Sequence, residues 1–340
     1  MNDSQLTRVG VIGTGGMGSR HVVNLHRYVG GATVTTVYDL DQGKAAQAAD
    51  QAGGASIADD PIQLIQSPNV DAVLIASPDD THARMTLACL EAGKPVLCEK
   101  PLATTVDDAV EVLDAEIGCG RRLVSVGFMR RFDPQHLAVK QAALSDEIGR
   151  PLLFKGVHRN ASVAFGISGA TVLTNSAGHD FDSARWLLGE EVQEVYVRGL
   201  RSRPELHPDT RDLLVIEMVL SNNCMAVAEV YVNDSYGYEV SAELVCQSGA
   251  AVTMQPDLAL VRAGGHRGHR VPSDWLSRFQ DAYVAELLDW IGSIQSEQPF
   301  HGASTWDGYA AMMVTSACIQ SLGSGAVVPV LLPEKPDFYR

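Results

Sequence analysis

Short β-rich runs and helical patterns alternate along the first third of the 340-residue chain. The runs are apolar and often β-branched, which predicts strands at Arg8–Ile12, Thr33–Tyr38, Asp71–Ala76, Pro95–Cys98 and Leu123–Gly127. The segments between them predict helices near Met17–Tyr28, Gln42–Gln51, Thr81–Ala92 and Val106–Ile117. Strict alternation of strand and helix indicates βαβ units, and therefore an α/β domain with a doubly wound parallel sheet.

The rest of the chain is patterned differently. Long β-rich segments predict strands at Leu152–His158, Glu191–Leu200, Leu213–Leu220, Met225–Asn233, Tyr238–Gln247 and Ala250–Gln255. Helices are expected near Pro134–Leu144, His179–Leu188, Ser277–Ser293 and Thr305–Leu322. Tight polar turns between consecutive strands favour an open, mostly antiparallel sheet in an α+β domain. We expect residues 1–127 to form the first domain and residues 128–340 the second, with Arg262–Arg270 as a mobile loop.

Charge and composition narrow the class of partner. The chain carries 41 acidic and 26 basic residues, a formal net charge of −15, which disfavours nucleic acid and anionic membranes as partners. We expect no signal peptide in the polar N-terminus and no membrane span, since no apolar run reaches about 18 residues. The six cysteines are scattered in mostly apolar segments, which indicates reduced core residues in a cytoplasmic protein.

A glycine-rich motif, Gly13-Thr14-Gly15-Gly16-Met17-Gly18, follows the first predicted strand and opens the first predicted helix. In that context the pattern is typical of dinucleotide binding, because the glycines let the backbone approach a pyrophosphate at a helix N-terminus. Asp39 ends the second strand, where a carboxylate can accept hydrogen bonds from an adenosine ribose. It would repel a 2′-phosphate, and no arginine is adjacent in sequence, so NAD is favoured over NADP. The alternative is a glycine turn that serves only packing.

Lys100 is the first catalytic candidate. It lies in Cys98-Glu99-Lys100-Pro101, at the carboxyl end of a predicted parallel strand, where open α/β sheets bind their ligands. A lysine there can donate to a substrate hydroxyl, and Pro101 fixes the direction of the chain beyond it. The alternative is a loop lysine paired with Glu99.

The segment Asn175–Trp186 holds the second candidate. If it is helical from its start, Asn175, His179, Asp182 and Trp186 share one stripe of the helix. A histidine with a carboxylate one turn away can act as a general base, whereas the alternative is a structural histidine. His82 begins a predicted helix and is expected to contact cofactor or cap that helix.

His266 and His269 have a metal-like spacing, but they lie in a glycine- and arginine-rich segment that contains no cysteine or carboxylate. We therefore expect no metal site.

Motifs along the whole chain resemble those of the Gfo/Idh/MocA oxidoreductases, and within them the inositol dehydrogenase branch. They are the glycine motif, Glu99–Pro101, Gly127–Asp133 (GFMRRFD), His158–Asn160 (HRN), His179–Leu187 (HDFDSARWL) and Pro336–Tyr339 (PDFY). The resemblance implies a Rossmann domain followed by a sheet domain that often builds a homotetramer. It also implies a polyol or sugar substrate in the cleft, with NAD as the hydride acceptor.

The resemblance assigns roles to residues. Lys100 would bind the reacting hydroxyl, and His179 would take its proton, with Asn175 nearby as a third catalytic residue. The expected cofactor-binding residues are Gly13, Thr14, Gly15, Gly16, Met17, Gly18, Asp39, Ser77, His82 and Glu99. The expected substrate-binding residues are Met129, Arg130, His158, Asp182 and Tyr236.

Asn175 departs from the family pattern, which has an aspartate four residues before the catalytic histidine. The amide keeps an acceptor but lacks the charge that favours a protonated histidine and grips a substrate hydroxyl. We therefore expect a cyclitol or sugar dehydrogenase with altered substrate orientation, preference or rate. Two alternatives remain: an enzyme that oxidises a sugar transiently and then eliminates, isomerises or hydrolyses it, and a non-catalytic regulator that senses NAD or sugar.

Overall fold

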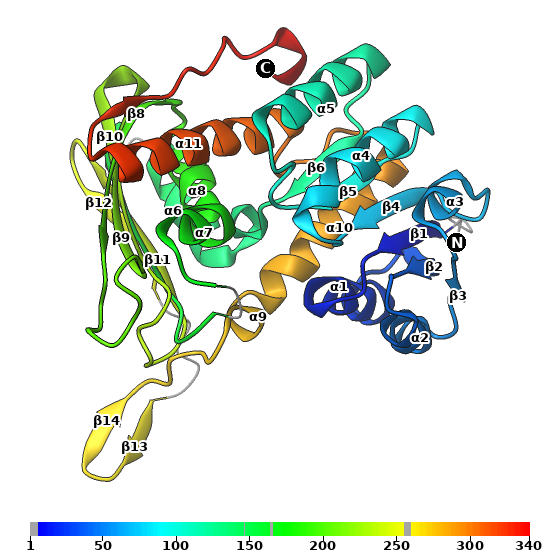
Figure 1. Cartoon of the computed structure of the whole chain (residues 1–340), viewed down its shortest axis with the longest axis horizontal. Coiled ribbons are helices and arrows are strands. Elements are labelled where there is room, and N and C mark those ends of the chain that lie inside the picture. Colours follow the sequence, from blue (N-terminus) through cyan, green and yellow to red (C-terminus); the bar gives the residue numbers. More distant parts are fainter. Residues whose placement is uncertain (1–5, 146, 164–165, 255–259) are drawn as a thin grey trace. The chain divides into compact units, whose positions relative to one another are not determined.

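The computed structural model describes residues 6–145, 147–163, 166–254 and 260–340, which form two compact units (Figure 1). The first unit comprises Met1–Phe132, Asp281–Met312 and Glu334–Arg340, and the second comprises Asp133–Gln280 and Met313–Pro333. The sequence pattern suggested a single break after Gly127. The later segments join the first unit because Leu287, Trp290 and Ile291 are buried in its core.

A six-stranded parallel sheet forms the centre of the first unit, in the order β3-β2-β1-β4-β5-β6 (Figure 1). Its strands are β1 (Thr7–Ile12), β2 (Ala32–Tyr38), β3 (Ser56–Ile57), β4 (Ala72–Ile75), β5 (Val96–Glu99) and β6 (Val124–Gly127). Its helices are α1 (Gly16–Arg27), α2 (Gln42–Gln51), α3 (Pro61–Gln66), α4 (His82–Glu91), α5 (Val106–Cys119) and α10 (Gln280–Ser296). The predicted doubly wound sheet is therefore confirmed, and it has the strand order of a Rossmann fold.

Local signals fix the ends of these elements. The side chains of Asp41, Asp60 and Thr105 cap the N-termini of α2, α3 and α5 by accepting backbone N–H groups. Gly120 ends α5 in the left-handed conformation, with φ of 66°. The short strand β3 and the helix α3 were not predicted, because neither is long enough to show a period.

The second unit is built on a seven-stranded mixed sheet in the order β12-β11-β7-β10-β9-β8-β15. Its strands are β7 (Pro151–Arg159), β8 (Val192–Leu200), β9 (Leu213–Leu220), β10 (Cys224–Tyr231), β11 (Glu239–Cys246), β12 (Ala250–Val252) and β15 (Val328–Pro329). Only β7 and β10 pair in parallel, so the predicted open, mostly antiparallel sheet is confirmed.

Helices cover one face of this sheet (Figure 1). They are α6 (Pro134–Leu144), α7 (Gly169–Val172), α8 (Gly178–Leu188) and the second half of α11 (Thr305–Ser324), and α9 (Trp275–Arg278) follows the sheet strands. Strict alternation in β9 and β10 buries Leu214, Ile216 and Ala226 under the helices. No helix of the described residues lies on the other face of these two strands (Figure 1).

The segment expected to be a mobile loop is instead a hairpin. β13 (Val261–Ala263) pairs with β14 (His266–Gly268) around Gly264 and Gly265, which have φ of 58° and 79°. Two consecutive positive φ angles are the requirement of a two-residue hairpin turn, and glycine meets it without strain. The sequence expectation missed this turn because the arginines and histidines around it read as a polar loop.

Five of the six cysteines are buried and Cys119 is exposed. Within the described residues, no helix is both long and apolar enough to cross a membrane.

Candidate active site

The glycine motif forms a tight connection between β1 and α1. Gly13 has φ of 86°, and a methyl group built on it would lie 2.4 Å from the Ser77 amide nitrogen. A methyl group on Gly18 would lie 1.8 Å from the Gly13 carbonyl oxygen. Gly15 and Gly16, in contrast, have open space where a side chain would begin. The loop therefore packs tightly against the protein at Gly13 and Gly18 and leaves space at the N-terminus of α1, as a pyrophosphate site requires.

Asp39 lies beside this loop and is held by it. Its Oδ2 accepts hydrogen bonds from the Thr14 amide at 2.7 Å and the Thr14 hydroxyl at 3.1 Å, and its Oδ1 accepts from the Asp41 amide at 2.9 Å. Burial acts to raise the pKa of Asp39, but these hydrogen bonds and the nearby Lys44 outweigh it and lower that pKa. The carboxylate is therefore charged and fixed in direction.

A cavity of about 370 Å³ opens between these residues. Gly13, Gly15, Asp39 and Ser77 all line it, so the glycine loop and the acidic residue face one space. This arrangement fits the adenosine and pyrophosphate of NAD. The lining also includes Lys44 and Arg84, although sequence adjacency had indicated no arginine near Asp39. Arg84 comes from α4, and only the folding of the sheet brings it here.

Lys100 follows β5 directly, while the glycine loop follows β1 and Ser77 follows β4. These three strands are neighbours in the parallel sheet, so all three segments lie at its carboxyl edge. The Lys100–Pro101 peptide bond is cis. Next to Lys100, the buried Glu99 receives a hydrogen bond on Oε1 from His21 Nε2 at 2.7 Å.

His82 is buried at the start of α4 and joins two of these loops. Its Nδ1 lies 2.6 Å from the Pro101 carbonyl oxygen, and its Nε2 lies 3.0 Å from the Ser77 carbonyl oxygen. Both partners can only accept, so both ring nitrogens carry a proton. Burial acts to lower the pKa of His82, but Cys98, the Pro101 carbonyl and Asp79 raise it to about 10. The ring thus ties Ser77 to the turn after Lys100.

The second unit carries the other catalytic candidates. A π-helical turn, Leu173–Ala177, precedes α8 and contains Asn175, so the stripe drawn for a regular helix does not apply there. The Asn175 amide nitrogen donates to the Thr171 carbonyl at 3.0 Å. His179 is partly buried in the first turn of α8, and Asp182 is buried in the same helix. π-Helical turns are often found at functional sites.

A buried pair connects β7 with α8. His158 Nδ1 lies 2.9 Å from Asp180 Oδ2, and both side chains are almost fully excluded from solvent. The ring edge of His158 also contacts Tyr238, with ring centroids 5.9 Å apart. Sequence reasoning selected Asp182 in this helix and missed Asp180. The available signal was the first carboxylate of the HDFD motif, Asp180, which points to a different side of the helix from Asp182.

Tyr236, expected to line the substrate site, is about half exposed. Its hydroxyl contacts Glu239 and accepts a hydrogen bond from Arg159 Nη1 at 3.2 Å. Burial and the Glu239 carboxylate raise the pKa of the Tyr236 phenol.

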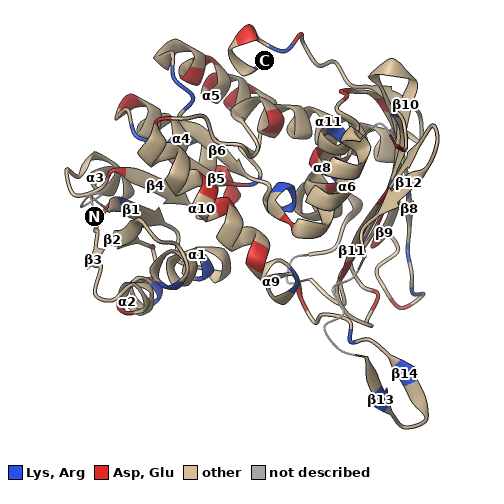
Figure 2. Ribbon diagram, turned by 180° about the vertical axis from the view of Figure 1, so that it is seen from behind, with Lys and Arg blue, Asp and Glu red and all other residues tan. Residues whose placement is uncertain are grey.

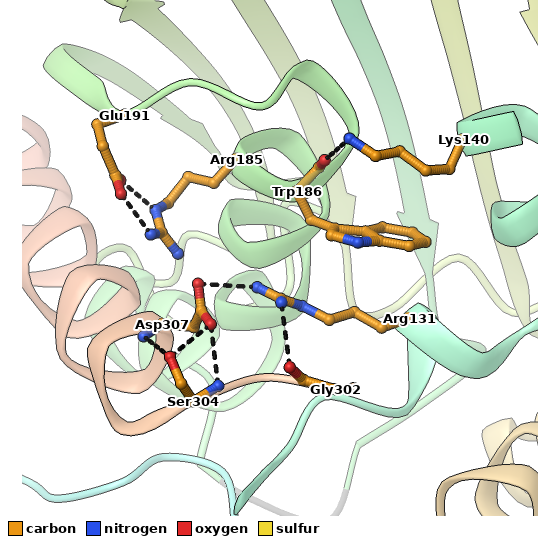
Figure 3. A network of polar contacts seen from close by, with 8 residues as sticks. All are labelled: Arg131, Lys140, Arg185, Trp186, Glu191, Gly302, Ser304 and Asp307. Atoms are coloured by element: carbon orange, nitrogen blue, oxygen red, sulfur yellow. Dashed lines mark hydrogen bonds and ion pairs between the residues drawn. The ribbon is translucent and has the colours of Figure 1, made fainter. Parts of the chain in front are cut away.

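Met129 and Arg130 are buried in a 3₁₀ turn, Met129–Phe132, that follows β6. The next residue, Arg131, forms an ion pair with Asp307 at 3.0 Å (Figure 3). Asp307 Oδ2 also accepts from the Ser304 amide at 2.9 Å and the Ser304 hydroxyl at 2.8 Å, at the start of α11. This network anchors the 3₁₀ turn that carries two predicted substrate residues.

The second unit has its own anchored segments. Arg185 of α8 pairs with Glu191 at 2.6 Å, and the Lys140 ammonium donates to the Trp186 carbonyl at 2.6 Å (Figure 3). Among the described residues, no group of three histidine, cysteine or carboxylate side chains could hold a metal ion.

Comparison with known proteins agrees with this geometry. Residues 7–128 match the family described as "Oxidoreductase family, NAD-binding Rossmann fold", and residues 136–252 match the GFO/IDH/MocA C-terminal domain. An inositol 2-dehydrogenase of Rubrobacter xylanophilus is 46% identical over 99% of this chain and 97% of its own length. An inositol 2-dehydrogenase/D-chiro-inositol 3-dehydrogenase of Shouchella clausii is 39% identical over 98% of this chain and 96% of its own.

Among solved structures, the myo-inositol dehydrogenase of Lactobacillus casei, in complex with NAD(H) and myo-inositol, has a TM-score of 0.94 at 30% identity. It covers 99% of this chain and 100% of its own. The chain therefore belongs to the Gfo/Idh/MocA family of oxidoreductases, with an NAD-binding Rossmann domain.

Proposed function

We propose that this protein is an NAD-dependent cyclitol dehydrogenase that oxidises a ring hydroxyl of an inositol to a ketone. The observation that carries the proposal is the carboxyl edge of the parallel sheet, where Lys100 lies beside the loops that fit NAD. Full-length similarity to inositol 2-dehydrogenases supports the choice of substrate class.

In this proposal each residue has one task. NAD, when bound, supplies the acceptor for the hydride that leaves the substrate carbon. Lys100 donates a hydrogen bond to the reacting hydroxyl and stabilises negative charge as its proton leaves. His179 accepts that proton as general base. Met129, Arg130 and Asp182 belong to segments that we assign to the polyol, whose other hydroxyls need several polar partners.

Asn175 would set the substrate preference. Its amide can present both a donor and an acceptor, whereas the family's aspartate presents only acceptors. The hydrogen bond from its amide nitrogen to Thr171 directs that end of the side chain toward its own helix.

The test is NADH formation, followed by absorbance, with NAD or NADP and a panel of myo-, scyllo- and D-chiro-inositol and common aldoses. We expect oxidation of at least one inositol with NAD. Lys100→Met and His179→Asn should each lower kcat by at least about 100-fold, the usual effect of losing an acid–base group. His207→Asn, an exposed histidine of the second unit, is the matched control. Absence of activity on the whole panel would refute the proposal.

A second candidate function, transient oxidation of the substrate, is favoured by Asn175 alone. If the enzyme oxidises its substrate only transiently, NAD will co-purify and a rearranged, eliminated or hydrolysed product will form without net NADH. The same assay, read by product analysis, separates the two.

We also propose that the helix-free face of the second sheet joins copies of this chain into a tetramer. Val215, Val219, Met225 and Val227 alternate with the core residues of β9 and β10 and lie on that face, together with Glu217 and Glu229. Light scattering should give the mass of a tetramer, and Val227→Lys should lower it, whereas a monomeric wild type would refute the proposal.

A further inference from the structure

Glu99 is a buried carboxylate between two motifs. It ends β5, next to Lys100, and its Oε1 lies 2.7 Å from Nε2 of His21 on the nucleotide-binding helix α1. His21 is fully buried, and Glu99 is 8% exposed. A buried carboxylate needs such a partner, because its charge is costly to desolvate.

The second carboxylate oxygen of Glu99 faces the turn that contains Lys100. Glu99 Oε2 accepts a hydrogen bond from the Lys100 amide at 3.3 Å. A methyl group on Gly127 of β6 would lie 3.0 Å from this oxygen, so glycine leaves the room that the carboxylate occupies. The carboxylate therefore bridges the His21 ring and the backbone of Lys100.

The His21 ring is held in one orientation. Its edge contacts the Tyr283 ring of α10, with ring centroids 5.8 Å apart. Its Nδ1 is buried and has no hydrogen-bond partner among the residues that the structure describes. A proton there would be an unsatisfied buried donor, so the neutral ring carries its proton on Nε2 and donates it to Glu99.

We infer that His21 is a positioning residue for Lys100, acting through Glu99 and linking the helix that receives the dinucleotide to the catalytic turn. The inference rests on the proposed role of Lys100. Three groups act on the Glu99 charge: His21 from α1, Lys100 from the same turn and His82 from α4. Burial acts to raise the pKa of Glu99, and these groups outweigh it and lower that pKa.

The test compares three variants of the full-length enzyme. His21→Phe keeps most of the ring volume and removes the donor, His21→Gln restores an amide N–H near the position of Nε2, and His26→Phe is the control on the exposed side of α1. We measure kcat at saturating NAD and polyol, the Kd for NAD by fluorescence, and the dependence of kcat on pH.

We expect His21→Phe to lower kcat by about 10–100-fold, the range for one lost hydrogen bond to a charged group, while the Kd for NAD changes less than about threefold. In His21→Phe the acidic limb of the pH dependence of kcat should move to higher pH, because Glu99 binds a proton more readily without the hydrogen bond from His21. His21→Gln should recover most of kcat and the normal limb. A purely structural role for His21 predicts neither the shift nor the rescue.

Glu99→Gln provides a second test if His21→Phe folds poorly. Combining Glu99→Gln with His21→Leu, a smaller apolar replacement that also removes the donor, should cost little more than Glu99→Gln alone, because both changes break the same hydrogen bond. Additive losses, or loss of NAD affinity with kcat retained, would overturn the inference. An inactive wild type would instead refute the proposed function.

Discussion

Glu116 forms a clamp that holds four distant segments of the first unit together. This fully buried carboxylate of α5 accepts the Leu123 and Val124 amides on Oε1, each at 2.7 Å. Its Oε2 accepts the Thr305 hydroxyl at 2.5 Å and the Tyr339 hydroxyl at 2.6 Å. The clamp thus joins α5, the start of β6, the first residue of α11 and the C-terminal turn, and Figure 2 marks the acidic positions along the α5 ribbon in red.

Tyr339→Phe removes one of these four hydrogen bonds and leaves the rest of the site intact. The ring would keep its edge contact with Phe338, at 4.8 Å between centroids, and its contact with the Arg122 guanidinium at 5.6 Å. The loss is therefore one hydrogen bond to a buried charged group, about 1.5–3 kcal/mol in the free energy of unfolding. For a domain of 150–250 residues this corresponds to a fall in Tm of roughly 3–12 °C.

The assay is thermal unfolding by circular dichroism at neutral pH. Tyr28→Phe, in which the tyrosine is 55% exposed, is the matched control and should leave Tm unchanged. Thr305→Val should cost a similar amount, and the double variant should show coupling, since both hydroxyls share Oε2. A fall in Tm of less than about 1 °C for Tyr339→Phe would show that the clamp does not stabilise the fold as argued.

Three further predictions concern the site. Asp39→Ser should raise the ratio of kcat/KM with NADP to kcat/KM with NAD by about 10–100-fold, because Lys44 and Arg84 remain in the cavity to receive a 2′-phosphate. Adding Arg84→Ala to the Asp39→Ser variant should reverse the gain. The pKa of His82 is raised to about 10 in the folded protein. The contribution of protonated His82 to the free energy of unfolding is therefore complete below about pH 6.5 and is lost as the pH rises to 10. The difference in Tm between wild type and His82→Gln should shrink over that range. Asn175→Asp should change the order of preference among inositols and aldoses in the NADH assay, and an unchanged order would remove Asn175 from the determinants of specificity.

Local patterns predicted most of the fold because they depend on near neighbours. Alternation of β-branched runs and helical periods located the strands of the parallel sheet, and the shift to strand-turn-strand spacing located the second sheet. The failures have local causes as well. The hairpin Val261–Gly268 was hidden by its polar residues, and a regular helix was assumed through the π-helical turn at Leu173–Ala177.

The candidate site was predicted in part. The sequence identified the glycine loop, Asp39 and the lysine at the end of a strand, because each lies in a motif that is continuous along the chain. It did not find His21 as the partner of Glu99, 78 residues away, or Asp180 as the partner of His158, 22 residues away. The residues near a histidine on a helix do not predict which distant side chain it will contact.

The sequence by itself determined most of the strands and helices, the dinucleotide loop and the preference for NAD, since these follow from side-chain period, glycine conformation and the charge of one carboxylate. Only the tertiary structure decided which buried charges meet. It placed Arg84 in the cavity of Asp39, and it placed Tyr339 and Thr305 on Glu116 across separations of 223 and 189 residues. The physical reason is that a buried carboxylate must find hydrogen-bond donors wherever packing brings them, and packing joins residues without regard to their distance along the chain.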